Sequence, residues 1–404
     1  MINKLKNLGP GLLFAGAAIG VSHLVQSTRA GADFGLGLLW ALLLIHLVKY
    51  PFFQFGPRYA TATGESLLDG YKKLGKGVLV AYFIVSLATM FTIQTAVTIV
   101  TAGIASSLFG GVIGIKIWTI IILAICLSLL IIGKYKLLDN LMKIIIITLT
   151  ISTIVAVIMA VVNNHNPLSF KQILPENSIE IAFLIAFMGW MPAPLDVAVW
   201  QSLWSIEKNK DTNHYHTKSA IFDFNIGYAG TIILGVCFVL LGTLVMFYSG
   251  ETFSDSASVF SSQLINMYTV NLGNWAYIII GIAAFTTMFS TTLTTLDASP
   301  RAMAKTTQLL FKKSLKLNYS FWIALLSIGT IAIFLFLASE MGLLIKIATI
   351  LSFITAPFYA IISYQLICSK HTPKAWHPSK KMHFLSWFGI AFLIGFSIWY
   401  LSTL

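Results

Sequence analysis

Residues 189–194 read Gly-Trp-Met-Pro-Ala-Pro and lie in the middle of an apolar segment that covers residues 180–204. Proline lacks the backbone N–H group and clashes with the preceding helical turn, so this segment should unwind at its centre. Residues 16–23 read Gly-Ala-Ala-Ile-Gly-Val-Ser-His inside another apolar segment, where glycine permits a similar interruption. Two glycines four residues apart can instead form a packing face against a neighbouring helix, so this break is the weaker prediction.

The composition indicates a helical protein that crosses a membrane many times. Of the 404 residues, 57% are hydrophobic and 10% are charged, whereas a soluble domain has about 25% charged residues. The apolar residues form long continuous blocks, which excludes a disordered, collagen-like or nucleic-acid-binding chain. Cys126, Cys237 and Cys368 lie far apart, so they predict neither a disulfide framework nor a CxxC metal site.

Charged residues divide the apolar blocks into eleven predicted spans. Each is long enough to cross about 30 Å of hydrocarbon at about 1.5 Å per residue. Their expected limits are residues 10–28, 36–55, 77–108, 112–133, 138–162, 180–204, 219–248, 274–298, 320–338, 342–368 and 384–403.

The basic residues predict the orientation of these spans. Most of the 26 Lys and Arg residues fall in alternate loops, among them Lys72, Lys73, Arg301 and Lys305. Because cytoplasmic loops carry the excess of Lys and Arg, we expect a cytoplasmic N-terminus and, with eleven spans, a C-terminus outside. The net charge of +12 then reflects topology in a plasma (cytoplasmic) membrane. The partners we expect are the lipid bilayer and a small inorganic ion or solute, with no nucleic acid and no obligate protein partner.

The two breaks lie in the first and sixth spans, which occupy matching positions in two groups of five. Interrupted helices at matching positions are typical of transporters built from inverted repeats. We therefore expect an all-α fold with a first repeat in residues 1–162, a second in residues 163–368 and an additional span in residues 369–404. Unwound backbone at membrane depth is tolerated where it lines a cavity, so the substrate site should lie between the breaks.

Motifs along the chain resemble the NRAMP family of divalent-metal transporters, which share the leucine-transporter-like fold with its 5+5 inverted repeat. The matching stretches include Gly-Pro-Gly at 9–11, Ala-Gly-Ala-Asp-Phe-Gly at 30–35, Thr-Gly-Glu-Ser-Leu at 63–67, Ser-Thr-Thr-Leu-Thr at 290–294 and Ala-Pro-Phe-Tyr-Ala at 356–360. The resemblance covers nearly the whole chain in the same order. It implies a secondary transporter that works by alternating access, with Mn or Fe as transported substrate. The resemblance implies that the protein is not an enzyme, and the sequence shows no nucleophile–base pair at a suitable spacing.

The metal site of the family is altered in the first break. The family signature there is Asp-Pro-Gly-Asn, whose acid and amide hold the metal, and the same positions are Gly20, Val21, Ser22 and His23. The metal-binding acid is thus replaced by glycine and the amide by histidine.

The second break and the proton path also depart from the family pattern. The family Met-Pro-His is kept at Met191 but reads Ala193 at the histidine position, and a second family histidine falls on Ala198. The acids that the family places in the third span are absent around Gln94. The resemblance therefore implies the family scaffold with a non-standard site.

Three side chains near the breaks are candidate metal ligands, each with an alternative. Asp196 lies near the midplane, where an ionisable group is costly and usually functional, either as a cation ligand or as a proton carrier. Its alternative role is to cap the restarted helix. His23 suits Mn, Fe, Co or Zn, or is a histidine bonded within the bundle. Met191 offers a soft sulfur, or packs in the core.

Hydroxyl groups in the eighth span offer a second kind of site. Ser290, Thr291 and Thr292 either bond neighbouring helices and carbonyls or hold sodium, as in sodium-coupled relatives of this fold. They support an alternative function, a sodium- or proton-coupled transporter of a small anion or neutral solute. One carboxylate compensates a dehydrated dication poorly, which favours this alternative. The predicted substrate-binding residues are Gly20, Ser22, His23, Gln94, Met191, Ala193 and Asp196.

Overall fold

The computed structural model describes residues 9–110, 113–211, 215–249, 252–273, 276–311, 317–336 and 341–402, and the regular structure in these ranges is helical. In chain order the helices are α2 (Pro10–Ala18), the π-helix η1 (Ser22–Ser27), α3 (Thr28–Phe34), α4 (Leu39–Thr63), α5 (Leu67–Leu74), α6 (Lys76–Phe109), α7 (Ile115–Val162), α8 (Ser178–Trp190), α9 (Val197–Asp211), α10 (Thr217–Val245), α11 (Ala257–Leu272), α12 (Ala276–Phe311), α13 (Tyr319–Phe336), α14 (Met341–Cys368), the 3₁₀ helix η2 (Lys374–Trp376) and α15 (Lys380–Leu401).

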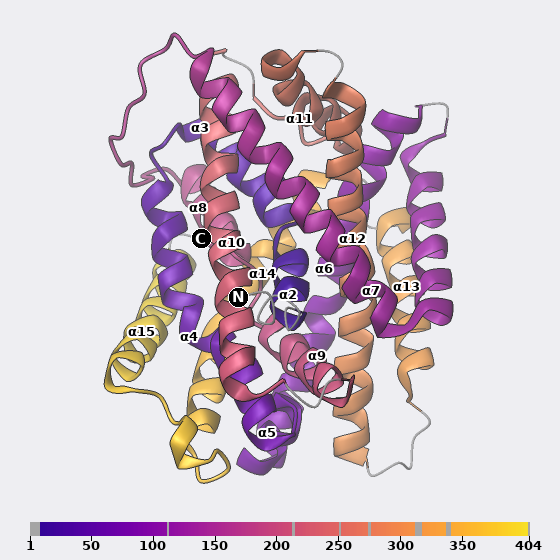
Figure 1. Ribbon diagram of the computed structural model, residues 1–404, viewed down its shortest axis with the longest axis vertical. Coiled ribbons are helices and arrows are strands. Elements are labelled where there is room, and N and C mark those ends of the chain that lie inside the picture. The colour runs from indigo at the N-terminus through magenta and orange to yellow at the C-terminus, as the bar shows by residue number, and fades with distance from the viewer. Residues whose placement is uncertain are drawn as a thin grey trace.

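The predicted spans have counterparts among these helices. Within the described ranges, α4, α6, α10, α13, α14 and α15 are long and apolar enough to cross a membrane alone, and the bent pair of α2 with η1–α3 makes a seventh span. The remaining predicted spans correspond to the two arms of α7, to α8 with α9, and to α12. In Figure 1 most helices run along the long axis, with α13 and α15 at opposite sides.

The connection between the fourth and fifth predicted spans differs from the prediction. We expected helices at residues 112–133 and 138–162, whereas helical structure continues from Ile115 to Val162 as α7. Figure 1 shows α7 as two arms joined by a sharp turn at the lower right, and their apolar parts are Ile115–Ile131 and Ile146–Val162. Both predicted spans are therefore present as the two arms, and the difference is that the connection between them is helical. Charged residues mark the edge of the apolar zone but are compatible with helix.

Several helices also extend beyond their predicted ends. The second span was expected to end at residue 55, but α4 continues through Pro57 to Thr63 and stops at Gly64, whose φ of 73° is left-handed. Similarly, α12 continues past Pro300 to Phe311. Hydropathy marks where a helix leaves the lipid, whereas a left-handed glycine marks where the helix itself ends.

The two broken spans pack on different partners in a reciprocal way. α2 and α3 of the first span pack on α10, the seventh span, while α9 of the sixth span packs on α4, the second span. If each span is replaced by the span five places away in the chain, the pair of spans one and seven becomes the pair of spans six and two. The same replacement leaves two other packed pairs unchanged, α6 with α12 (spans three and eight) and α4 with α10 (spans two and seven). This reciprocity is expected for two equivalent halves of five spans.

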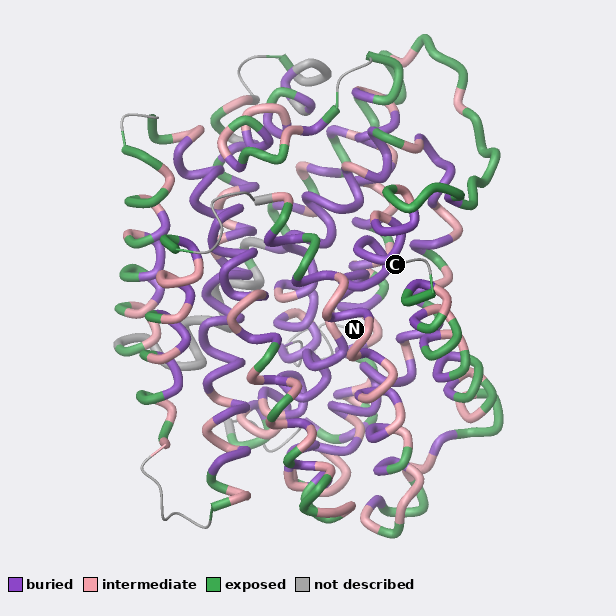
Figure 2. Tube along the Cα trace, turned by 180° about the vertical axis from the view of Figure 1, so that it is seen from behind, coloured by how far each residue is buried: buried purple, intermediate pink, exposed green. Residues whose placement is uncertain are grey.

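The burial pattern is that of a protein surrounded by lipid. Figure 2 shows buried positions concentrated inside the bundle and exposed ones along its outer helices. Large apolar side chains are among the exposed ones, such as Phe336 at 83% and Phe384 at 75%. An exposed apolar belt of this extent is a liability in water but favourable in a bilayer, so the chain is a multi-pass membrane protein.

Candidate functional site

The first break lies where we predicted it. α2 ends at Ala18, the next helical segment begins at Ser22, and the two halves are bent by 45°. Gly20 lies in the break, and a Cβ atom there would be 2.6 Å from Thr291 Oγ1 of α12. The side chain of Thr291 therefore occupies the space next to the position where the family has its metal-binding acid.

The second break is confirmed as well. α8 ends at Trp190, where Met191 N–H makes the last bond to Phe187 O at 3.2 Å. Helical bonding resumes when Val197 N–H donates to Pro194 O at 3.2 Å, directly after the second proline. The intervening residues 191–196 have no regular helical structure.

The two breaks face each other across a small cavity. Ser22 Oγ lies 3.2 Å from Pro192 O, and residues of both breaks line the cavity together with residues of α6 and α12. The cavity has a volume of about 20 Å³ for the centre of a water molecule, which is enough space for one water molecule or a bare ion. The predicted position of the site, between the breaks, is therefore where the structure has this cavity.

Neutral oxygen atoms provide the polar chemistry of this cavity. The hydroxyl side chains in its lining are Ser22, Thr291 and Thr295, and none of the described lining residues is acidic or a histidine. Thr291 Oγ1 also lies 3.2 Å from Gly16 O of the first span. Hydroxyl and carbonyl oxygens are hard donors that can hold a cation or bind a polar solute.

His23 is directed away from this cavity in the described conformation. The side chain is fully buried, and Nε2 donates to Thr231 O of α10 at 2.9 Å. Nδ1 lies 2.7 Å from Ser22 Oγ and 3.1 Å from Ala18 O. Because a carbonyl only accepts, Nε2 carries the proton that it donates to Thr231 O, and Nδ1 lies within hydrogen-bond distance of both the Ser22 hydroxyl and Ala18 O. Both nitrogens thus hold the first break together.

Met191 and Asp196 are buried beside the cavity without lining it. Met191 Sδ lies 4.0 Å from Ser27 Oγ of η1. The Asp196 carboxylate interacts with the backbone N–H of Val197 at the start of α9, as in the capping alternative, while its Oδ1 has no hydrogen-bond partner among the described residues. In the described ranges, no three His, Cys, Asp or Glu side chains gather as a metal site. The roles of His23, Met191 and Asp196 as metal ligands stay predictions.

Of the remaining predicted residues, Ala193 lines the cavity whereas Gln94 and Thr292 tie α6 to α12. Gln94 Oε1 accepts from Thr295 Oγ1 at 2.7 Å, and Thr292 Oγ1 lies 2.8 Å from Thr101 Oγ1. Ser290 donates to its own helix at Thr287 O. Among the predicted sodium ligands, Thr291 is the one that faces the first break.

From the sequence we assigned no role to Lys49, which lies within the predicted span at residues 36–55. The Lys49 side chain is completely buried, and its ammonium donates to Met188 O, Gly189 O and Ala193 O of the second break. The signal was a lysine near the middle of an apolar span, which is costly unless it is fully bonded.

A polar stripe on α9, also missed, leads away from the cavity. Val197 and Trp200 line the cavity, and Gln201, Trp204 and Ser205 follow within two turns. These three are buried, yet the Gln201 amide atoms, Trp204 Nε1 and Ser205 Oγ have no hydrogen-bond partner among the residues that the structure describes. Buried polar groups of this kind are normally satisfied by water, which makes this face of α9 a candidate inner path.

Polar contacts hold both ends of the bundle. At one end, Arg29 Nη1 lies 3.0 Å from Asp255 Oδ1. On the α2 side of the first break, the Asp223 carboxylate of α10 accepts from Gly11 N–H at 2.8 Å and Gly9 N–H at 3.2 Å, which anchors the start of α2. These contacts fix the first span against its surroundings on both sides of the break.

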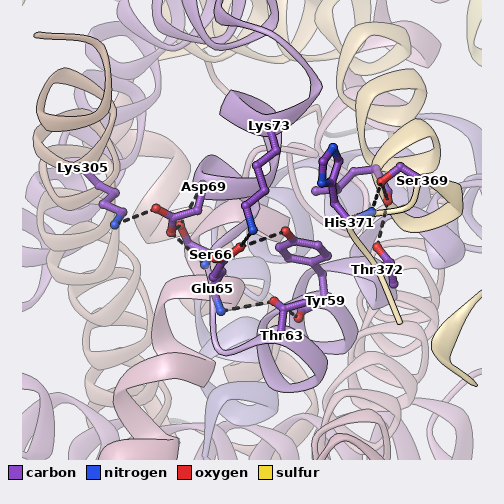
Figure 3. Close-up of polar contacts among 11 residues, drawn as sticks. Tyr59, Thr63, Glu65, Ser66, Asp69, Lys73, Lys305, Ser369, His371 and Thr372 are labelled. Atoms are coloured by element: carbon purple, nitrogen blue, oxygen red, sulfur yellow. Dashed lines mark hydrogen bonds and ion pairs between the residues drawn. The ribbon is translucent and has the colours of Figure 1, made fainter. Parts of the chain in front are cut away.

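A further cluster joins α5 to α12, as Figure 3 shows. Ser66 caps α5 and bonds with Asp69, and Asp69 Oδ1 lies 2.9 Å from Lys305 Nζ. Burial acts to raise the pKa of Asp69, but hydrogen bonds from Lys305 and Ser66 outweigh it, so the pKa lies below its usual 3.8. The Thr-Gly-Glu-Ser-Leu motif at 63–67 is thus a helix end followed by a helix cap.

Comparisons with known proteins agree with this architecture. An uncharacterized protein of Pasteurella multocida is 34% identical over 99% of this chain and 93% of its own length. A mutant of the Eremococcus coleocola manganese transporter superposes with a TM-score of 0.74 at 14% identity, covering 96% of this chain and 85% of that one. MhsT in complex with L-phenylalanine gives a TM-score of 0.66 at 15% identity, covering 98% of each chain. These structures share the fold with broken first and sixth spans that the sequence predicted.

The family model described as Nramp, natural resistance-associated macrophage protein-like, matches residues 11–403. With this match over nearly its whole length, the chain belongs to the Nramp family.

Proposed function

We propose that this protein is a secondary active transporter that moves a divalent transition-metal ion of the Mn or Fe class by alternating access, and that it is not an enzyme. The observation that carries this proposal is the cavity lined by both breaks, joined across by Ser22 and Pro192. The fold shared with a manganese transporter supports the choice of cargo. The proposal places the protein in the plasma membrane with a cytoplasmic N-terminus and an external C-terminus.

The proposal assigns the two repeats to residues 1–162 and 163–368, with residues 369–404 as an additional span. The reciprocal packing of α2 and α3 on α10 and of α9 on α4 supports this division. Alternating access then means that one group of helices rocks against the other around the cavity. The polar face of α9 would provide an inner path, and the Arg29–Asp255 ion pair lies at the opposite end, where both residues line a larger hollow that would serve as the outer entrance.

In the described conformation the metal shell would be non-standard. Hydroxyls of Ser22, Thr291 and Thr295 and carbonyls of the breaks are the oxygen donors at the cavity. We propose that Met191 and Asp196, adjacent to lining residues, join this shell when the second break rearranges, and that His23 positions Ser22. A shell with so little negative charge should leave the ion partly hydrated and weakly bound.

A second candidate is a sodium- or proton-coupled transporter of a small anion or neutral solute. Two observations favour it: none of the described lining residues is acidic, and Thr291 Oγ1 with Gly16 O forms a neutral oxygen pair of the kind that suits sodium.

Uptake by purified protein in liposomes tests these alternatives. We expect Mn²⁺ uptake, measured with a fluorescent indicator inside the vesicles, that responds to a proton or sodium gradient. The isosteric change Thr291→Val removes a hydroxyl from the cavity and should reduce uptake about tenfold, as the loss of one good contact of about 1.4 kcal/mol would. Thr330→Val in α13 is the matched control, since Thr330 is buried outside the cavity lining.

The same assay can reject the metal proposal. Absence of uptake and of thermal stabilisation with every divalent ion contradicts it. Sodium-dependent stabilisation that disappears in Thr291→Val would then support the second candidate.

A further inference from the structure

The ammonium of Lys49 fills a cluster of backbone carbonyls at the second break. Lys49 belongs to α4, and its side chain has no exposed surface. Nζ lies 2.7 Å from Gly189 O, 2.9 Å from Met188 O and 3.2 Å from Ala193 O. An ammonium has three N–H donors, so all three are used on the break itself.

The positions of these three carbonyls favour a nearby cation. Met188 and Gly189 belong to the last turn of α8, whose carbonyls have no helical partner once the helix stops at Trp190. They also form the negative end of the α8 dipole. Ala193 adds a third oxygen from the far side of Pro192, so the oxygens converge from both sides of the unwound segment.

The surrounding charges match a fixed positive group. Asp196 of the same break is close enough to interact electrostatically with the ammonium, and its buried Oδ1 has no hydrogen-bond partner among the described residues. On α4, His46 lies one turn before Lys49 and uses Nδ1 on Leu42 O. Burying an ammonium is costly unless its N–H groups are bonded, and the three carbonyls meet that condition here.

We propose that Lys49 is a tethered cation, which permanently occupies a cation-binding position built by Met188, Gly189 and Ala193. In this role the chain itself supplies the charge that a bound ion would otherwise supply at the second break. Ala193 bonds Lys49 and also lines the cavity. An exchangeable cation is therefore excluded from these three carbonyls, and its ligands must come from the other groups around the cavity. This inference does not depend on which cargo is carried.

Removal of the side chain tests the proposal. The change Lys49→Ala leaves the three carbonyls without their cation, so the melting temperature in detergent should fall by several degrees. Ethylammonium, methylammonium, sodium or potassium chloride should restore most of this loss, compared with choline chloride at equal ionic strength. Wild-type protein and the control Lys346→Ala, which removes an exposed lysine of α14, should show no such difference between the salts.

The variant Lys49→Gln keeps the proposal falsifiable if Lys49→Ala does not fold. Its amide donates two hydrogen bonds to carbonyls but carries no charge, so we expect it to fold, to melt below wild type and to gain stability from small cations. A Lys49→Gln protein as stable as wild type without any cation response would overturn the proposal, and so would a Lys49→Ala protein that no small cation stabilises. Both readouts are melting temperatures, so they remain interpretable if no transport is found.

Discussion

Both breaks are interruptions of a helix within a membrane span, but different kinds of side chain bond the backbone at each. At the first break, neutral groups satisfy the backbone: Ser22 lies within hydrogen-bond distance of Ala18 O and Pro192 O, and His23 reaches Thr231 O. At the second break, a buried ammonium from another span, Lys49, satisfies the carbonyls. The first break is therefore held by neutral contacts, whereas the carbonyls at the second break are held by a side chain that stays attached to α4.

Gly20 at the first break and Gly189 at the second differ in the atoms around them, and substitution of Gly189 should have the largest effect on stability. A Cβ atom at Gly189 would lie 2.2 Å from Thr349 O, a backbone atom of α14. Gly189→Ala should force α8 away from α14 and cost about 3 kcal/mol or more, since overpacking against backbone cannot relax easily. The measurement is the melting temperature and the fraction of monodisperse protein after extraction.

The corresponding change at the first break, Gly20→Ala, should be milder. There the added Cβ meets the Thr291 side chain at 2.6 Å, which can shift, and Thr291→Ser in the same chain should relieve part of the cost. Gly230→Ala in α10, where nothing lies within 4 Å, is the matched control. Equal losses at Gly20 and Gly189 would show that the two breaks are equally rigid and would contradict the comparison.

The next largest effect concerns the neutral bonding of the first break. His23→Leu removes a ring bonded at both nitrogens and leaves Thr231 O without this donor, so stability should fall by about 1–3 kcal/mol. His46→Leu serves as the reference, because the His46 ring bonds Leu42 O of its own helix and its Nε2 has no hydrogen-bond partner in the described part of the chain. If His46→Leu proved the more destabilising of the two, the role of His23 in holding the break would be refuted.

A smaller effect is expected for the contact that joins the breaks. Ser22→Ala removes the hydroxyl beside Pro192 O and His23 Nδ1, which should cost about 1 kcal/mol and reduce uptake because Ser22 lines the cavity. Ser27→Ala, which loses a longer contact to Met191 Sδ at 4.0 Å, should change uptake little. A Ser22→Ala protein with unchanged stability and uptake would mean that the breaks are not coupled through this hydroxyl.

The smallest effect concerns the far end of α12, the helix that supports the first break through Thr291. Asp69→Asn weakens the partly exposed pair with Lys305 and should cost less than about 1 kcal/mol. Because the pKa of Asp69 is lowered from 3.8 in the folded protein, its contribution is present above this value and is lost only as the pH falls below it. The stability difference between wild type and variant should thus be the same at about pH 7 and about pH 5. A difference that shrinks between these two values would show that the pKa is raised instead.

Much of the scaffold was predictable because the signals are local. Pro192 and Pro194, only two residues apart, interrupt their helix, whereas the single proline Pro300 lies inside the continuous helix α12. The long apolar blocks required membrane spans. The exact helix ends were less predictable, as α4 shows by running on to Gly64. The site was predicted only in part: Ser22, Ala193 and Thr291 lie at the cavity, but the direction of the His23 ring depends on Thr231, 208 residues away.

The sequence by itself determined that this chain is a multi-pass membrane protein with two broken spans, because proline, glycine and hydropathy act on their immediate neighbours. Only the tertiary structure decided which polar groups serve each break. Lys49 and Met188 are 139 residues apart in the chain, and a lysine in an apolar span gives no sign of which carbonyls it will reach. That choice depends on how α4 packs against the end of α8, and packing between distant helices is a property of the folded bundle.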